Sequence, residues 1–141
     1  MVRVLATGSF DILHPGHLLY LSKAKALGDE LYVIVARNSM IKHKPKPVIP
    51  EEQRLAMVKA LRIVDNAQLG SEKDIFEPLC QIKPDIIALG KNQFFDEKKL
   101  ESELMDHSIN AKVVRIQSFE QCELCSSAAI IKKIMERNIL L

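Results

Sequence analysis

Short apolar segments alternate along the chain with segments of helical periodicity, and this alternation limits the fold more than any other feature. We expect strands at residues 2–7, 31–36, 67–69, 85–89 and 112–116, and helices at 15–27, 51–61, 75–82, 97–106 and 126–137. The strand segments are largely continuous apolar runs, which is typical of strands buried on both faces. The alternation predicts an α/β, Rossmann-like, doubly wound fold of about five parallel strands with helices on both faces.

Helical periodicity also predicts which helix faces are apolar. In the first helix, Leu18, Leu21, Ala24 and Leu27 fall on one face. In the last helix, the apolar stripe consists of Ile130, Ile131 and Ile134.

Length and charge exclude several classes of protein. The chain has 141 residues, and we find no repeat or linker, so we expect residues 1–141 to form a single domain. Its formal net charge of +2 is too small to indicate nucleic-acid binding. No apolar run approaches the roughly 18–20 residues that a membrane helix needs, and the N-terminus does not have the pattern of a signal peptide. We expect a cytoplasmic protein that binds neither nucleic acid nor membrane.

The segment after the first expected strand carries the strongest functional signal. Residues 8–17 read Gly-Ser-Phe-Asp-Ile-Leu-His-Pro-Gly-His and enter the first helix. Gly8 permits a sharp turn, and Gly16 has no side chain, so a ligand can approach the backbone there. The start of a helix presents free backbone N–H groups and the positive end of the helix dipole, which attract phosphate. His14 and His17 are three residues apart and face the same way, toward one phosphate. Two surface histidines, or half of a metal site, are the alternatives, but the flanking glycines favour a phosphate site.

This segment resembles the signature of the cytidylyltransferase-like nucleotidyltransferases, and the resemblance extends over nearly the whole chain. It is closest to the glycerol-3-phosphate cytidylyltransferase type and, within that group, to the archaeal-type FAD synthases. The features that favour the latter are Val35-Ala36-Arg37, residues 49–54, residues 83–87 and the cysteines near the C-terminus.

The resemblance implies roles for these residues. The backbone of Ser9 and Phe10 would bind the triphosphate, and Asp11 would brace the loop. His14 and His17 would bind the α- and β-phosphates and stabilise the transition state. The substrate phosphate would attack the α-phosphorus directly, and pyrophosphate would leave. A divalent cation, Mg²⁺ by expectation, would neutralise the triphosphate without a protein ligand.

Lysines at alternate positions follow the second strand, in the sequence Lys42-His43-Lys44-Pro45-Lys46. In the family, lysines here contact the substrate phosphate and the triphosphate. We favour Lys44 as a catalytic residue and Lys46 as a nucleotide ligand over Lys42; a solvated loop is the alternative. Arg54, on the following helix, matches a family arginine and would support this loop.

Two further loops complete the expected site. Gly90 and Asn92 follow the fourth strand, where family members usually carry an aspartate in place of Asn92. Phe94 and Phe95 would either stack on a flat ligand ring or belong to the hydrophobic core or to a lid over the site. Ser126 and Ser127 align with a family Ser-Thr pair that binds the triphosphate at the start of the last helix.

Compared with the family pattern, the chain lacks one positively charged side chain that would contact phosphate. The family arginine falls at Gln121, and Arg115 lies too early in the alignment to replace it. Lys91 is a candidate to compensate.

Three cysteines are present. We expect Cys122 and Cys125 to be free thiols; a thiol needed for activity and a structural metal site are the alternatives. Cys125 lies near a helix N-terminus, which lowers a thiol pKa. If Cys122 and Cys125 were oxidised to a disulfide, we expect the bond to distort the phosphate-binding segment at the start of the last helix.

The leading functional hypothesis is adenylyl transfer from ATP to FMN, giving FAD and pyrophosphate. The alternatives are CTP-dependent transfer to glycerol-3-phosphate or another small polyol phosphate, and a nucleotide-binding module that has lost catalysis. Relatives of this type are commonly homodimers, so a homodimer is a possible assembly.

Overall fold

The computed structural model describes residues 1–42, 44–118 and 121–137, and these contain five strands and five α-helices in alternating order. The strands are β1 (Arg3–Gly8), β2 (Glu30–Val35), β3 (Asn66–Leu69), β4 (Ile86–Leu89) and β5 (Lys112–Arg115). The helices are α1 (Pro15–Lys25), α2 (Glu51–Lys59), α3 (Glu77–Ile82), α4 (Glu97–Asp106) and α5 (Ser127–Glu136), and a 3₁₀ turn, η1 (Asn38–Met40), follows β2. In the described part of the chain, no helix is both long and apolar enough to cross a membrane.

The strands form one parallel sheet in the order β3-β2-β1-β4-β5, which confirms the predicted fold class. Gly8 pairs with Val35 at the carboxyl ends of β1 and β2, and Leu89 pairs with Arg115 at the ends of β4 and β5. The chain runs outward in one direction from β1 to β3 and then returns to β4 on the other side of β1. The order therefore reverses between β1 and β4, and ligands bind at such a switch point.

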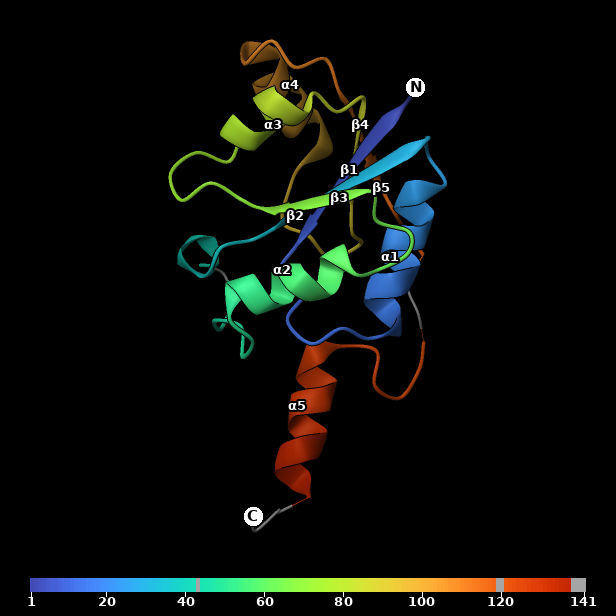
Figure 1. Cartoon of the computed structure of the whole chain (residues 1–141), viewed down its shortest axis with the longest axis vertical. Helices are drawn as coiled ribbons and strands as arrows, with labels where there is room; N and C mark the ends of the chain where they lie inside the picture. Colours follow the sequence, from blue (N-terminus) through green and yellow to red (C-terminus); the bar gives the residue numbers. More distant parts are fainter. Residues whose placement is uncertain (43, 119–120, 138–141) are drawn as a thin grey trace.

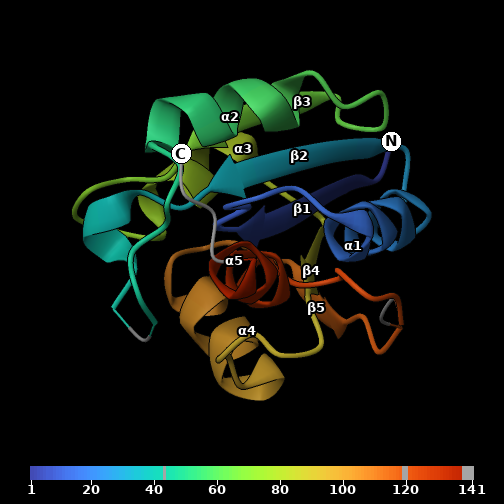
Figure 2. The ribbon, with the colours of Figure 1, turned by 90° about the horizontal axis from the view of Figure 1, so that it is seen from below.

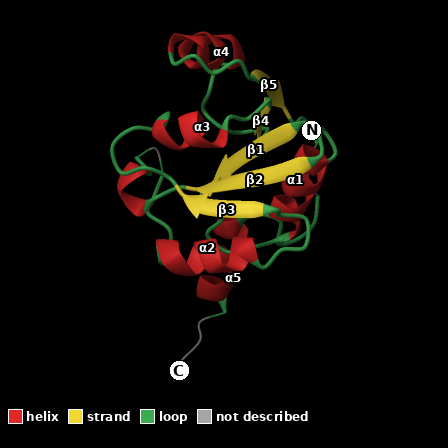
Figure 3. Cartoon of the chain, turned by 45° about the horizontal axis from the view of Figure 1, so that its top comes forward, coloured by secondary structure: helices red, strands yellow, loops and turns green. Residues whose placement is uncertain are grey.

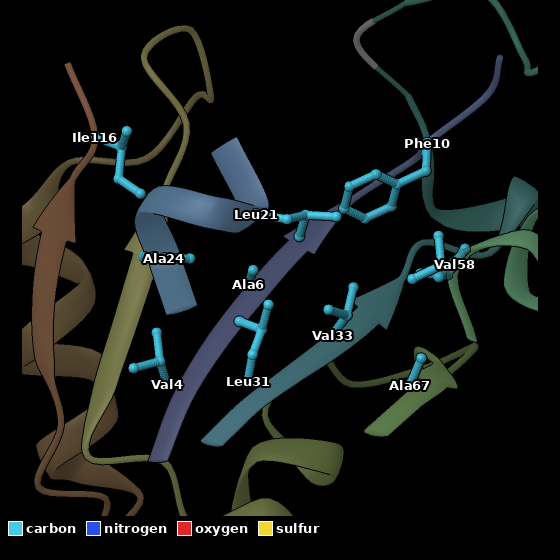
Figure 4. Close-up of a cluster of buried hydrophobic side chains, with 12 residues drawn as sticks. Val4, Ala6, Phe10, Leu21, Ala24, Leu31, Val33, Val58, Ala67 and Ile116 are labelled. Atoms are coloured by element: carbon cyan, nitrogen blue, oxygen red, sulfur yellow. The ribbon is translucent and has the colours of Figure 1, made fainter. Parts of the chain in front are cut away.

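Helices cover both faces of the sheet (Figure 3). Val4 and Ala6 of β1 pack with Leu21 of α1 and Val58 of α2 in one buried cluster, part of which is drawn in Figure 4. Leu5, which points the other way, packs in a second cluster with side chains of α3 and α4. Since burying a Leu or Val side chain contributes about 1.5–3 kcal/mol, these two layers fix the sheet and the loops at its carboxyl edge.

Two helices differ from the expected pattern. In α1, Leu21 and Ala24 are buried, but Leu18 is 43% exposed and Leu27 is 36% exposed, so the predicted apolar face is only partly covered. The third helix begins at Glu77 rather than at residue 75, because Ser71 and Asp74 hold the preceding backbone in a turn.

The last helix extends away from the sheet (Figure 1) and is seen end-on in Figure 2. None of the residues of α5 is buried, and Ile134 of the predicted stripe is 53% exposed. The contribution of α5 to the molecule therefore lies at its N-terminal end, where it meets the β1–α1 loop.

Candidate nucleotide-binding site

The loop from β1 to α1 is held by a phenylalanine with an unusual backbone. Phe10 has a φ of 51°, in the left-handed region, and its side chain is buried in the core cluster that includes α1 and α2. The ring lies against Gly8, where an added Cβ would come within 2.9 Å of it. A side chain at position 8 would therefore displace the ring. Gly8 and Phe10 act as one unit that sets the path of the loop beyond β1.

The two histidines of the loop form a stacked pair at the start of α1. Their ring centroids are 3.8 Å apart, and the angle between the planes is 29°. Nδ1 of His14 accepts a hydrogen bond from the backbone of Gly16 (3.1 Å), and Nδ1 of His17 accepts one from the backbone of His14 (3.3 Å). Because both Nδ1 atoms are acceptors, each neutral ring carries its proton on Nε2. The pair therefore offers two Nε2–H donors from one helix start.

The surroundings keep both imidazoles neutral. Burial, the neighbouring His14 and Lys44 lower the pKa of His17 to about 4, although Asp11 opposes this change. Burial also lowers the pKa of His14 from its ordinary value. At neutral pH the two histidines thus present N–H dipoles and not imidazolium charge.

Asp11 and Arg54 brace the loop from the opposite side. The Asp11 carboxylate accepts hydrogen bonds from the backbone N–H groups of Val48 and Ile49, both at 2.9 Å. Arg54 is 1% exposed, and its guanidinium donates to Ser9 O (2.5 Å), Ile49 O (2.9 Å) and Asn38 Oδ1 (2.6 Å). These bonds tie the loop after β1 to η1 and to the segment that leads into α2.

The lysines after β2 point to different partners. Lys44 Nζ donates to Ser9 Oγ at 2.9 Å, so the predicted catalytic lysine meets the phosphate loop. Lys46 Nζ donates to the carbonyls of Asn38 and Ile41, both at 2.6 Å, and so stabilises its own loop. Lys42 lines an adjacent cavity, and His43 lies outside the described residues.

The start of α5 contacts the histidine loop directly. The Ser127 hydroxyl accepts a hydrogen bond from Ile12 N (3.4 Å) and donates one to Ile12 O (3.3 Å). Ser126 caps α5 by accepting from Ala129 N at 3.0 Å. A Cβ on Gly16 would come within 3.1 Å of the carbonyl oxygen of Cys125 and within 2.8 Å of the His14 ring. The structure therefore brings Gly16, Ser126 and Ser127 to one place, the entrance to α1.

The cysteines before α5 are joined by a disulfide between Cys122 and Cys125, so the prediction of free thiols was wrong. Their Cα atoms are 5.3 Å apart, within the range that a disulfide spans, because the turn before α5 folds back over three residues. With this bond in place, the contact between Ser127 and Ile12 is still made. Cys80 is a free and exposed thiol.

The loop after β4 is held by two side chains whose role was not predicted. Gln93 accepts from Gly90 N at 2.6 Å and donates to Thr7 O at 3.1 Å, which fastens the loop to the end of β1. Arg115 donates to the carbonyl oxygens of Gly90 (2.9 Å) and Gln93 (3.0 Å), with further bonds to the carbonyls of Lys91 and Phe95. Arg115 thus binds the loop itself, and Asn92, on this loop, is exposed at the cavity edge.

A cavity of about 530 Å³ lies beside this loop, on the sheet face that α3 and α4 cover. Apolar side chains from β1, β2, β4, η1, α3 and α4 form most of its wall. Gly8, Ser9 and Lys44 stand at its edge, so it opens onto the same loop that carries the histidines. The site therefore has two parts, an N–H-lined part at α1 and an apolar part across β1.

Comparisons with known proteins show the family of this chain. A family model described as Cytidylyltransferase-like matches residues 5–133. An FAD synthase of Methanohalophilus mahii is 63% identical over 98% of this chain and 97% of its own length. An FAD synthase of Methanosarcina mazei is 64% identical over 97% of this chain and 91% of its own length. The crystal structure of a protein of Thermoplasma volcanium, titled as a lipopolysaccharide core biosynthesis protein, is 48% identical with a TM-score of 0.82, over 86% of this chain and 99% of that one.

A more distant structure, a pantoate-β-alanine ligase of Francisella tularensis, shares the fold at 19% identity with a TM-score of 0.59, over 94% of this chain and 64% of that one. The fold is that of a Rossmann-like nucleotidyltransferase. The chain belongs to the cytidylyltransferase-like family, and its curated relatives at 60–64% identity carry the name FAD synthase.

Proposed function

We propose that this protein is an FMN adenylyltransferase, which joins AMP from ATP to FMN and releases pyrophosphate. The observation that carries the proposal is identity above 60% over nearly the full length with FAD synthases. The geometry supports it because an anion-binding loop and an apolar cavity meet at Ser9 and Lys44, and FMN has both a phosphate and a large flat ring.

The chemistry follows from the positions of the donors. A phosphate oxygen of FMN attacks the α-phosphorus of ATP, and the bond from this phosphorus to the β-phosphate oxygen breaks, so that pyrophosphate leaves with the electron pair. The Nε2–H groups of His14 and His17 donate to the phosphate oxygens on which charge builds. Lys44 brings a positive charge between the two substrates. Such transfer depends on positioning and electrostatic stabilisation and needs no covalent nucleophile.

In this proposal the remaining predicted residues form the nucleotide site, most by contact with the nucleotide and Lys46 by holding a loop. Gly8, Ser9 and Phe10 supply backbone at the loop, Gly16 leaves room beside the histidines, and Ser126 and Ser127 place the start of α5 against the phosphates. Gly90 and Asn92 are placed to meet the nucleoside, and Lys46 acts indirectly by holding the lysine loop.

A divalent cation, Mg²⁺, belongs to the proposal as a partner of the triphosphate. The described residues contain no cluster of three or more His, Cys, Asp or Glu side chains that fits a metal ion, and both oxygens of Asp11 already accept backbone hydrogen bonds. ATP phosphates and water would therefore supply its ligands. When bound, the ion supplies charge neutralisation of the leaving pyrophosphate.

We also propose a cytoplasmic location, a homodimer, and lower activity when Cys122 and Cys125 are oxidised to the disulfide than when they are reduced. The unburied apolar side chains of α5 support the dimer. The closeness of the cysteine turn to Gly16 supports the redox effect, because a rearranged turn would move against the histidine loop.

The substrates can be tested by pyrophosphate release with Mg²⁺, crossing ATP and CTP against FMN and glycerol-3-phosphate in the presence and absence of reductant. We expect turnover with ATP and FMN and at least ~100-fold less with the other pairs, since a site built to pair specific polar groups rejects mismatched substrates. Turnover with CTP and glycerol-3-phosphate would replace the proposed substrates. No turnover with any pair would favour the non-catalytic module.

A further inference from the structure

The apolar cavity lies on the opposite side of β1 from the histidines. Leu5, Ile34, Ile87 and Leu89 form its floor, and these side chains belong to the core cluster of α3 and α4. Phe10, next to the histidine pair, belongs instead to the cluster of α1 and α2. The β1–α1 loop therefore lies between two compartments, and Ser9 and Lys44 line the cavity where it meets this loop.

The lining of the cavity selects the chemistry of its occupant. Its volume of about 530 Å³ is that of a pocket for an organic molecule of drug size, for which ~300–1,000 Å³ is typical. A small polyol would place its hydroxyl groups against aliphatic and aromatic walls, and buried hydroxyls without partners are unfavourable. A flat heteroaromatic ring would instead cover these walls and turn its polar edge toward Ser71, which also lines the cavity.

Two phenylalanines stand at the edge of the cavity, outside the protein core. Phe94 is 82% exposed and Phe95 is 41% exposed, and both line the cavity. They lie on the loop after β4, which Gln93 joins to Thr7 by a hydrogen bond. Arg115 donates hydrogen bonds to four carbonyl groups of the same loop. Arg115 is itself paired with Glu97 at 2.6 Å. A rigid loop that holds two aromatic rings beside an apolar cavity is suited to stacking on a planar ligand.

Resting on the proposed function, we propose that this cavity binds the isoalloxazine ring of FMN, with Phe94 and Phe95 stacking on it as the residues that select a flavin over a small polyol phosphate. The ribityl chain then leads past Ser9, and the FMN phosphate reaches Lys44 beside the histidine pair. Arg115 is the positioning residue that keeps the phenylalanine loop in place.

The test uses lumiflavin, which has the flavin ring but neither ribityl chain nor phosphate. We expect lumiflavin to inhibit the wild-type enzyme competitively against FMN and not against ATP. In the double variant Phe94→Ala/Phe95→Ala, the Kd of FMN, measured by flavin fluorescence without ATP, is expected to rise at least ~10-fold, with the KM for ATP unchanged. Met105→Ala is the matched control, because Met105 is exposed on α4 and does not line the cavity.

The outcomes separate this inference from the proposed function. If FMN is adenylylated but its Kd is unchanged in the double variant, or if lumiflavin competes with ATP, the assignment of the cavity is overturned while the activity stands. If wild-type enzyme neither binds nor adenylylates FMN, the proposed function fails first. A rise in the FMN Kd equal to that of Met105→Ala would also overturn the assignment.

Discussion

Replacing His17 with alanine is expected to lower turnover by about 100- to 1,000-fold, on the scale of losing one preorganised transition-state donor. The reason is geometric, since Nδ1 of His17 is used by the backbone of His14 and only Nε2–H is left for the substrate. His14→Ala should have a similar effect, because Gly16 occupies its Nδ1 in the same way. Steady-state rates of pyrophosphate release at saturating ATP and FMN measure both losses.

A second variant separates catalysis from helix capping. His17→Asn keeps an acceptor near the position of Nδ1, so it retains the cap, but it has no donor at the position of Nε2. We expect it to melt near the wild-type temperature and to be as slow as the alanine variant. His107→Ala, the same change at an exposed histidine after α4, is the control and should retain near-normal turnover. Near-normal rates in either alanine variant would refute the proposed mechanism.

Replacing Arg54 with methionine is expected to lower the free energy of unfolding by at least ~3 kcal/mol. The variant leaves three acceptors, Ser9 O, Ile49 O and Asn38 Oδ1, without their donor, and each buried unsatisfied polar group costs about 1–3 kcal/mol. Methionine fills much of the same volume, so lost hydrogen bonds and not a large cavity cause the change. Thermal unfolding should show a Tm lower by roughly 10 °C.

The control for Arg54 is Arg62, which is exposed shortly after the same helix. Arg62→Met removes the same charge and should shift Tm by no more than ~2 °C, as surface substitutions usually do. In Arg54→Met the loop carrying Ser9 loses its support, so the KM for ATP should rise as well. An Arg54→Met protein that melts with the wild type would show that the buried guanidinium does not hold the loop.

The order and type of the elements could be predicted from the sequence because each has a local signal. Continuous apolar runs such as Leu31–Val35 indicated strands, and Pro15 and the Pro-Glu-Glu at position 50 indicated helix starts. The exposure of Leu18 and Leu27 could not be predicted, because it depends on where α1 lies on the sheet. Periodicity shows that a helix has an apolar face but not how many turns of that face are covered.

The same distinction holds for the site. The residue spacing indicated the histidine pair and the capping serines, because both are local to a helix start. The role of Arg115 required the knowledge that β5 pairs with β4 and so lies beside the loop after β4. Its position six residues before Gln121 gave no sign of this. The disulfide likewise depends on the path of a turn, which the spacing of Cys122 and Cys125 leaves open.

The most direct test of the account follows the α-phosphorus itself. ATP labelled with ³²P at the α-phosphate would be incubated with FMN, Mg²⁺ and the purified protein, and the products and the protein would be separated. Direct attack by the FMN phosphate predicts that the label appears in FAD, in amounts equal to the pyrophosphate released, and that none is bound to protein. Label on the protein, or label only in AMP, would contradict adenylyl transfer to FMN by direct displacement.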